Sequence, residues 1–344
     1  MTVTATRAVE PRTVAFWTMA VLMLFGLWES EKNLLPSMRA FPASTVVDVV
    51  FLVVSLAFGL WLIRRVLRPV QAPPWSGTWL AVLWGGLAAC GIALLLNGML
   101  LSAWSRTLDL ETASAWSAAL TAPINEEFAK AAGVFLLAAV STRLVRGAAD
   151  GFVLGALVGF GFQVFENFSY GFMQVMVYGG VDSTAATAQA LGIRFFLTGL
   201  GSHWAMSAVA GAGIGYLVGA VRRPLGRRVW VAIGCMVLAM AMHWQFDSPV
   251  TQHLIEPIGP TLINFVIALI VYRMVRRDFR SRWDAASAEE VRAGVLEPEE
   301  AQTLSRRRAR KRHVKAFPKG PEREAAASRQ AAALALVEDR TADR

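Results

Sequence analysis

The chain has 344 residues, of which 55% are hydrophobic and only 17% are charged, and its mean hydropathy is +0.45. This composition excludes an ordinary soluble domain and predicts an all-α protein that crosses a membrane several times. Its two cysteines, Cys90 and Cys235, both fall in apolar segments, where we expect them to pack as small hydrophobic side chains and not as a disulfide.

Eight segments approach the roughly 20 apolar residues that a helix needs to cross a bilayer. In chain order they are residues 13–28, 43–63, 78–102, 121–140, 149–177, 191–220, 229–247 and 255–273. The first segment lacks a cleavage pattern of small residues and is followed by further spans, so we expect it to remain in the protein. The sequence therefore predicts about eight transmembrane helices.

Arginine positions give an independent prediction of orientation. Arginines gather before the first span, in alternate connections and after the last span: Arg7, Arg12, Arg64, Arg65, Arg68, Arg143, Arg146, Arg222, Arg223, Arg227, Arg228, Arg273, Arg276 and Arg277. Cytoplasmic loops carry an excess of lysine and arginine, whereas the other connections here are poor in arginine or acidic. We expect a multi-pass protein of the plasma membrane with both termini in the cytoplasm.

The character of the chain changes near residue 274. Residues 1–273 are predicted as the transmembrane domain, and residues 274–344 as a cytoplasmic, largely disordered tail. A basic block at residues 306–315 follows an acidic run at residues 297–300. Beside a membrane, such a block more often contacts anionic lipid headgroups or solvent than nucleic acid, so we expect lipids as its partners.

Six ionisable residues lie inside the predicted spans. They are Glu126, Glu127, Lys130, Glu166, His203 and His243. An ionisable group in hydrocarbon is costly without a partner, so such residues indicate a functional site. The predicted topology places all six in the outer half of the bilayer, although their helices run in alternate directions, and this agreement predicts one shared site.

Local spacing suggests partners within the site. Lys130 lies four residues after Glu126 and three after Glu127, so it can pair with either carboxylate on one helix face. His243 and Asp247 are four apart, which lets the carboxylate hold one ring nitrogen while the other faces a metal. Two histidines with carboxylates form a common catalytic zinc site, and a further carboxylate can act as general base.

The sequence lacks the common soluble hydrolase signatures. It contains no His-Glu-x-x-His, no Gly-x-Ser-x-Gly and no Walker loop. Glycine-rich stretches at residues 151–161 and 211–219 are better interpreted as small-residue faces that let two helices approach closely. Any hydrolytic chemistry should therefore come from the polar residues inside the spans.

Several short motifs occur together in a recognisable order. They are Glu-Glu-x-x-Lys at residues 126–130, Asp-Gly at residues 150–151, Phe-Glu-Asn-x-x-Tyr at residues 165–170, Arg194, Ser202-His203, and His243. Their combination, over roughly residues 75–272, resembles the PrsW family of intramembrane metalloproteases. That family is related to the type 2 CAAX prenyl protease and bacteriocin-processing group. In the same pattern, Asp247 stands where an amide is common.

The resemblance implies metal-dependent hydrolysis of peptide bonds in membrane-anchored proteins, near the extracytoplasmic face, as in cleavage of an anti-sigma factor. We expect His203, His243 and Glu166 to hold a divalent metal, with zinc the expected ion. Either Glu127 or Glu126 would then activate the water as general base. The two glutamates are neighbours on the helix surface, so the sequence leaves this choice open.

Four further residues are expected to support the reaction. Lys130 would neutralise the glutamate that does not act as base, and Asp247 would orient His243. Asn167 and Arg194 would polarise the scissile carbonyl or stabilise the oxyanion.

Two other functions remain compatible with the sequence. The polar cluster could be a buried network in a noncatalytic membrane scaffold or immunity-type protein. Intramembrane acids and histidines also serve proton relays in transporters, although no internal repeat or paired broken helices favour that class here. Bound metal would separate a metalloprotease from a hydrogen-bonded network.

Overall fold

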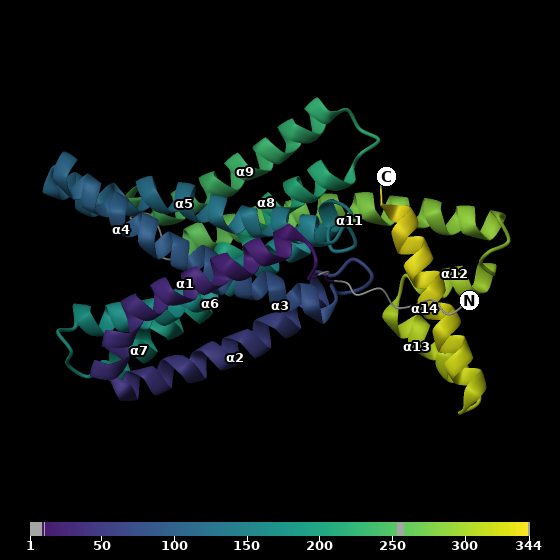
Figure 1. Ribbon diagram of the computed structural model, residues 1–344, viewed down its shortest axis with the longest axis horizontal. Coiled ribbons are helices and arrows are strands. Elements are labelled where there is room, and N and C mark those ends of the chain that lie inside the picture. The colour runs from purple at the N-terminus through teal and green to yellow at the C-terminus, as the bar shows by residue number, and fades with distance from the viewer. Residues whose placement is uncertain (1–8, 10, 253–257, 343–344) are drawn as a thin grey trace.

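The computed structural model describes residue 9, residues 11–252 and residues 258–342. Within these residues the regular structure is entirely helical, with no strand. Long helices lie side by side along one direction, and a cluster of shorter helices near the C-terminus caps one end of the bundle (Figure 1). The predicted all-α class is confirmed.

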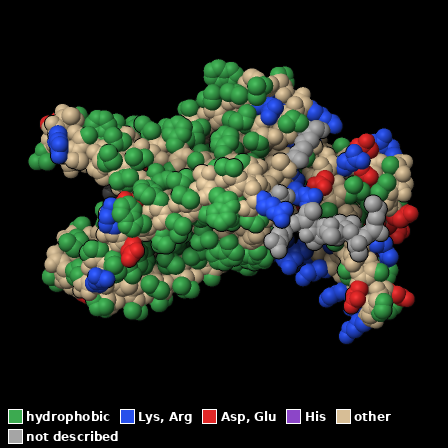
Figure 2. Space-filling view, in the orientation of Figure 1, with side chains coloured by type: hydrophobic (Ala, Val, Ile, Leu, Met, Phe, Trp, Pro, Cys, Tyr) green, Lys and Arg blue, Asp and Glu red, His purple; other side chains and the backbone are tan. Residues whose placement is uncertain are grey.

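Six helices among the described residues are long and apolar enough to cross a membrane. They are α1 (Val14–Ala40), α2 (Pro42–Val66), the continuous run Trp75–Thr107, α6 (Ala148–Val177), α9 (Leu225–Asp247) and α11 (Ile258–Arg292). Hydrophobic side chains cover the surface of the bundle, whereas charged side chains gather over the C-terminal helices (Figure 2). The chain is therefore a multi-pass membrane protein.

Two of the eight predicted spans are not among these six. The span at residues 121–140 lies in α5 (Leu110–Val140), which carries three charged residues at its centre, and α8 (His203–Gly219) has only 17 residues. Both helices pack inside the bundle against other helices. The count of eight and the orientation stay predictions, and the expected start of the last span at residue 255 lies outside the described residues.

The predicted span at residues 191–220 is wrong as one continuous helix. The chain runs through α7 (Ser183–Gly192), the π-helix η2 (Ile193–Leu197) and the 3₁₀ turn η3 (Gly199–Gly201) before α8 begins at His203. Gly201 allows this break to approach α11, because a side chain there would collide with the carbonyl of Thr261. His203 is thus the first residue of a helix and not a mid-helix residue.

Helix α6 forms the centre of the bundle and packs closely on α8. A Cβ atom at Gly155 would collide with the carbonyl of Ser207, and one at Gly159 with the carbonyl of His203. Small residues thus let the two backbones meet, as the glycine-rich stretches predicted. Because Glu166 follows Gly159 by two helical turns, this contact places Glu166 beside the start of α8.

The run Trp75–Thr107 contains a π-helical turn. Helix α3 (Trp75–Leu83) leads into η1 (Trp84–Ala89), which continues as α4 (Cys90–Thr107). The indole of Trp84 is buried and donates a hydrogen bond to the carbonyl of Ala129 on α5, at 2.9 Å. This contact ties α5, which carries the Glu-Glu-x-x-Lys motif, to the wall of the bundle.

The tail is helical, where the sequence suggested a largely disordered segment. Helix α11 continues past residue 273 to Arg292 and is followed by α12 (Pro298–Leu304), α13 (Arg307–Ala316) and α14 (Pro321–Thr341). The short α10 (Pro249–Gln252) precedes α11. A few apolar side chains spaced along these helices form a common core: Phe279, Trp283, Leu304, Leu334 and Val337. Their spacing is too sparse to stand out in a charged segment.

An ion pair fixes this helical tail to the bundle. Arg146, at the start of α6, donates to Glu338 of α14 at 3.0 Å and to Asp150 at 2.9 Å. Asp150 and then Glu338 stabilise the charged form and raise the pKa of the Arg146 guanidinium above its usual value. The tail therefore has a defined place at the arginine-rich end of the bundle.

Candidate metal centre

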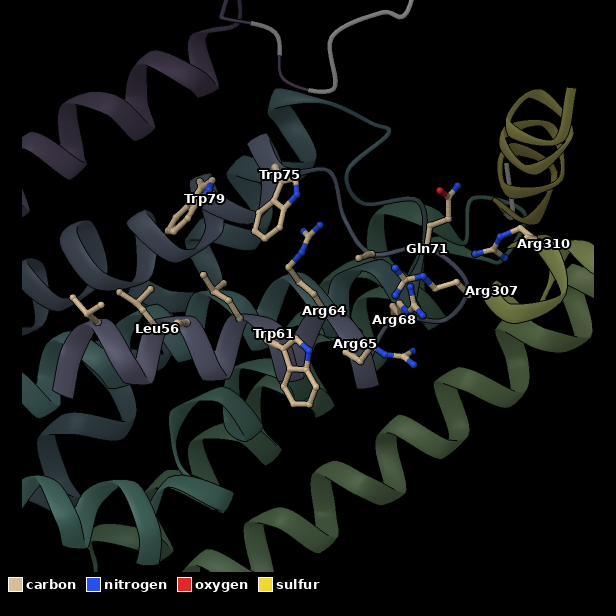
Figure 3. A pocket seen from close by; sticks show the side chains of 14 residues that line it. Leu56, Trp61, Arg64, Arg65, Arg68, Gln71, Trp75, Trp79, Arg307 and Arg310 are labelled. Carbon is tan, nitrogen blue, oxygen red and sulfur yellow. The ribbon is translucent and has the colours of Figure 1, made fainter. Parts of the chain in front are cut away.

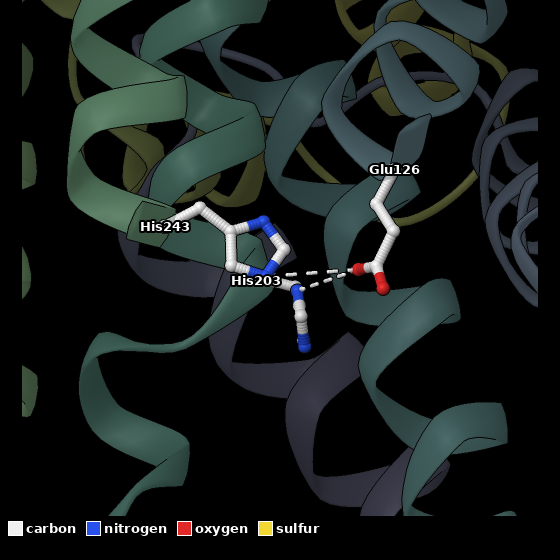
Figure 4. Close-up of side chains that lie close together, drawn as sticks. All are labelled: Glu126, His203 and His243. Atoms are coloured by element: carbon white, nitrogen blue, oxygen red, sulfur yellow. Dashed lines mark ion pairs between the residues drawn. The ribbon is translucent and has the colours of Figure 1, made fainter. Parts of the chain in front are cut away.

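Three side chains from three helices meet inside the bundle. Glu126 comes from α5, His203 from the first turn of α8 and His243 from α9, and all three are buried. Oε2 of Glu126 lies 3.8 Å from Nδ1 of His203 and 3.8 Å from Nε2 of His243 (Figure 4). Segments far apart in the sequence thus bring one carboxylate oxygen and two ring nitrogens to one point.

The geometry of this group fits a metal ion. One ligand atom from each of the three residues lies within 4.8 Å of the others. Ligand atoms on one tetrahedral zinc ion lie roughly 3.4 Å apart, so a small closure around an ion suffices. Oε2 of Glu126 is buried and has no hydrogen-bond partner among the described residues. Lys130 Nζ approaches this oxygen only to 3.5 Å. A buried carboxylate oxygen without a hydrogen bond is costly, and a cation at this point would satisfy it.

The charges around the group also favour a cation. The cluster contains four carboxylates and two permanent cations: Glu126, Glu127, Glu166, Asp247, Lys130 and Arg194. With neutral imidazoles the cluster carries a surplus of two negative charges, which a divalent ion would balance.

Lys130 pairs with both glutamates of its motif, as the spacing predicted. Its Nζ lies 2.6 Å from Oε1 of Glu127 and 3.5 Å from Oε2 of Glu126. It also lies 3.0 Å from Nδ1 of His203, and the side chain is fully buried. Lys130 therefore offsets part of the cost of burying two adjacent carboxylates.

His243 is held by a different carboxylate from the one expected. Its Nδ1 lies 2.9 Å from Oε1 of Glu127, which is the contact that orients a metal-binding imidazole. The sequence had assigned this role to Asp247, but Oδ2 of Asp247 lies 3.4 Å from Nε2, the nitrogen that faces Glu126. Asp247 is thus on the ligand side of His243 and not behind it.

Glu166 is also not where the sequence placed it. Its Oε2 lies 2.9 Å from Nε2 of His203, which is the ring nitrogen away from Glu126. The same oxygen accepts a hydrogen bond from the guanidinium of Arg194. Glu166 therefore supports His203 from behind, and Glu126 is the carboxylate that joins the two histidines.

The Phe-Glu-Asn-x-x-Tyr motif forms a clamp for Arg194, which lies on the π-helix η2. Besides the bond to Glu166, the Nε of Arg194 donates to Oδ1 of Asn167 at 2.6 Å, and the guanidinium stacks on the ring of Tyr170 at 3.7 Å. A π-helical turn often occurs at a functional site, and here it aims the arginine at α6. The oxyanion role expected for Asn167 and Arg194 stays a prediction, because the two bind each other here.

Comparison with known proteins gives one match. The family model of the PrsW family intramembrane metalloprotease matches residues 73–275, which is more than half of the chain. The chain belongs to the PrsW family. No curated protein and no solved structure matches it.

Membership of the PrsW family establishes the general activity. The protein is an intramembrane metalloprotease that hydrolyses peptide bonds, and its chemistry implies a divalent metal. The matched residues agree with the segment over which the sequence resembles the family. The group of Glu126, His203 and His243 lies inside this segment and could bind the ion.

Sequence reasoning missed Asn97, which lies within the PrsW match. Its Nδ2 donates to Oε1 of Glu126 at 2.9 Å, and its Oδ1 accepts from Nδ2 of Asn125 at 3.3 Å. Asn97 thus fixes one oxygen of Glu126 and leaves the other free toward the histidines. The available signal was a single amide in an otherwise apolar span.

Asp48 was also missed, although it lies in the second predicted span. Its side chain on α2 is 1% exposed, and neither carboxylate oxygen has a hydrogen-bond partner among the described residues. It faces Gly171 of α6, where a Cβ atom would collide with both of its oxygens. Asp48 lies outside the PrsW match, so no family motif marks it. The sequence signal for Asp48 was its position as an acidic residue inside a predicted span.

Proposed function

We propose that Glu126, His203 and His243 hold the catalytic metal, and that the metal is zinc. The observation that carries this proposal is the buried Oε2 of Glu126, which has no hydrogen-bond partner among the described residues and lies 3.8 Å from each of two ring nitrogens. Nitrogen and oxygen ligands in a group of three match catalytic zinc sites, which leave a position for water. Bound zinc would supply a Lewis acid and lower the pKa of that water.

The neighbouring carboxylates then take distinct supporting roles. Glu166 accepts from His203 and directs the opposite ring nitrogen, Nδ1, toward Glu126. Glu127 does the same for His243 through Nδ1. Carboxylates placed behind metal-binding histidines fix the tautomer and raise the basicity of the ligand nitrogen. Arg194 positions Glu166, and Lys130 positions Glu127.

This division of roles favours Glu127 as the general base. Glu126 Oε1 is held by Asn97 and its Oε2 faces the histidines, so both of its oxygens are assigned. Glu127 Oε1 is shared by Lys130 and His243, whereas Oε2 has no partner among the described residues. That oxygen is the available proton acceptor for an attacking water.

The substrate we propose is a membrane-anchored protein, cleaved near the extracytoplasmic face. The three residues of the metal group are almost fully buried, whereas the side chains of Asp247, Arg194 and Glu166 are 21%, 19% and 16% exposed. We infer that a peptide and water enter from the side of these partly exposed residues. The arginine distribution supports assigning this side to the extracytoplasmic face of a plasma-membrane protein with cytoplasmic termini. An anti-sigma factor anchored in the membrane is a substrate of this class.

Comparison of membrane-protein fragments tests this function. Cells would carry the intact protein, the Glu127→Gln variant or the matched Glu111→Gln variant, which alters an exposed glutamate on the same helix. We expect membrane-anchored fragments that depend on the intact protein, disappear with Glu127→Gln and persist with Glu111→Gln. Identical fragments in all three would contradict the assignment and favour a noncatalytic scaffold with a buried polar network.

A further inference from the structure

A large groove lies at the arginine-rich end of the bundle, far from the metal group in the sequence. Its volume is about 970 Å³, and α2, the connection to α3, α3 and α13 line it (Figure 3). Five arginines and three tryptophans are among its lining residues, but no aspartate or glutamate is: Arg64, Arg65, Arg68, Arg307, Arg310, Trp61, Trp75 and Trp79. The groove therefore has a chemistry that proteolysis does not use.

The arginines at one end of the groove lack compensation. Arg65, Arg68 and Arg307 make no hydrogen bond or ion pair with the described residues, although they lie close enough for mutual repulsion. Burial lowers the pKa of the Arg68 guanidinium, and the charges of Arg307, Arg65 and Arg310 lower it further. The carboxylate of Glu338 lies nearby but is already bound by Arg146 and Gln71, at 3.0 Å and 3.1 Å.

Arg64 has a different place in the groove. Its guanidinium stacks on the ring of Trp75 at 3.7 Å and donates to the carbonyl of Pro73 at 2.6 Å and to the hydroxyl of Thr78. These contacts fix the connection between α2 and α3, so Arg64 shapes the wall. The unpaired charge comes from Arg65, Arg68 and Arg307.

The other end of the groove is apolar. Val53, Leu56 and Leu60 recur at helical spacing on one face of α2, and Trp79 of α3 lies across from them (Figure 3). From Val53 to Arg64 the helix rises about 16 Å, close to the half-thickness of a bilayer core of ~30 Å. Tryptophans of the kind that line this groove are enriched where a membrane meets water.

We propose that this groove binds one long-chain anionic phospholipid. Its headgroup phosphate would lie among Arg65, Arg68, Arg307 and Arg310, and an acyl chain would follow Val53 and its neighbours along α2. Phosphate satisfies clustered guanidinium groups through charge-assisted hydrogen bonds. A free phosphate or a nucleic acid would leave the apolar wall unused.

The lipid would also join the tail to the membrane. Arg307 and Arg310 belong to α13, whereas Arg65 lies in the last turn of α2 and Arg68 follows the end of that helix, so one headgroup bridges two parts of the chain. Each basic residue near an anionic membrane surface contributes attraction that falls off within a Debye length. The groove is therefore a specific lipid site and not only a basic patch on a solvated tail.

Native mass spectrometry of the full-length protein in detergent tests this proposal. The protein would be titrated with dioleoyl phosphatidylglycerol, with dioleoyl phosphatidylcholine, with short-chain dihexanoyl phosphatidylglycerol and with inorganic phosphate. The test variant, R65Q/R68Q/R307Q, keeps Arg310 because that side chain also donates to the carbonyl of Leu304. The matched control removes three exposed arginines outside the groove, one of them also from α13: R223Q/R227Q/R308Q.

We expect one dioleoyl phosphatidylglycerol per chain, with affinity lowered roughly tenfold or more in the test variant and about twofold or less in the control. Phosphatidylcholine should bind far more weakly, and neither short-chain lipid nor inorganic phosphate should displace the long-chain lipid. Equal binding of both headgroups or equal loss in both variants would overturn the proposal. Displacement of the long-chain lipid by inorganic phosphate would also overturn it, because the site would then recognise the phosphate group alone.

Discussion

The protein contains two concentrations of charge that are built in opposite ways. In the metal centre, carboxylates, histidines and cations from α5, α6, η2, α8 and α9 are buried or partly buried and contact one another at 2.6 to 3.8 Å. In the groove at the arginine-rich end, five arginines line an open volume, and no carboxylate is among the lining residues (Figure 3).

This difference indicates what each region binds. In the buried cluster, nearly all polar atoms have a hydrogen-bond or ion-pair partner within the protein, so the cluster needs only a small ion and the peptide bond of the substrate. The oxygens that lack a hydrogen bond indicate where the ion and the substrate bind. A cluster of one sign at a membrane surface needs an external partner of the opposite sign. Substitutions in the metal centre test whether its residues depend on one another as their contacts indicate.

Removing a histidine should have the largest effect on the metal centre. His203→Ala deletes one nitrogen of the metal group and removes one of the two partners of Glu166, so we expect kcat/KM for peptide cleavage to fall roughly 10³-fold or more. Circular dichroism should show an unchanged helix content. Near-normal cleavage by a folded His203→Ala protein would exclude this nitrogen from the reaction.

Removing the central cation tests the pairing inside the cluster. Lys130→Met leaves two adjacent buried carboxylates without their shared partner, and breaking such a pair costs about 3–5 kcal/mol. We expect that loss in the free energy of unfolding in detergent, with part of it recovered in K130M/E127Q.

Lys32 provides a matched control for this change. It also pairs with a glutamate, Glu29, at 2.7 Å, but its side chain is 52% exposed. Lys32→Met should therefore cost about 1 kcal/mol or less. An equal loss in the free energy of unfolding for Lys130→Met and Lys32→Met would show that burial of the ion pair does not determine its contribution to stability.

Arg194 tests the carboxylate behind His203. Arg194→Gln removes the partner of Glu166 and of Asn167, so we expect metal affinity or activity to fall roughly 10- to 100-fold, as for other supports behind metal ligands. Arg194→Lys should not restore it, because an ammonium cannot bond both residues and stack on Tyr170. If Arg194→Lys had full metal affinity, only the positive charge at this position would matter, and the hydrogen-bond geometry of the arginine would not.

Among the described residues, Asp48 is the buried acid without a partner, and it should give the smallest effect. Asp48→Asn keeps the shape and removes an unpaired acid from the interior, so we expect the free energy of unfolding to rise by about 1–3 kcal/mol. Thermal unfolding in detergent measures this. A clear loss of stability would show that Asp48 has a partner that the carboxylate needs.

Much of the site could be predicted from the sequence because intramembrane charges are rare and costly. The predicted depths along the helices indicated one shared site for the histidines and glutamates, although the depth of His203 assumed a continuous helix that is broken before that residue. The spacing in residues 126–130 predicted the Lys130 pairs. The position of Glu126, and not Glu166, between the two histidines could not be predicted. It depends on the break before His203, which sets the direction of the imidazole.

The break and the tail show what sequence patterns lack. Residues 191–220 are apolar throughout, so hydropathy alone predicts one span, whereas the turn at Gly199–Gly201 arises from a tertiary contact with α11. The tail helices are held by a few apolar side chains and by the Arg146–Glu338 pair, which joins residues far apart in the chain. Such long-range contacts leave little trace in local composition.

The metal content of two neighbouring variants tests the central claim most directly. Mass spectrometry of the metal in purified protein should find about one divalent ion per chain, lost in Glu126→Gln and retained with weaker affinity in Glu127→Gln, because Glu127 also supports His243. Both variants should be inactive. This outcome would assign Glu126 to the metal and Glu127 to the proton. Metal retained in Glu126→Gln and lost in Glu127→Gln, or no metal in the intact protein, would contradict the account.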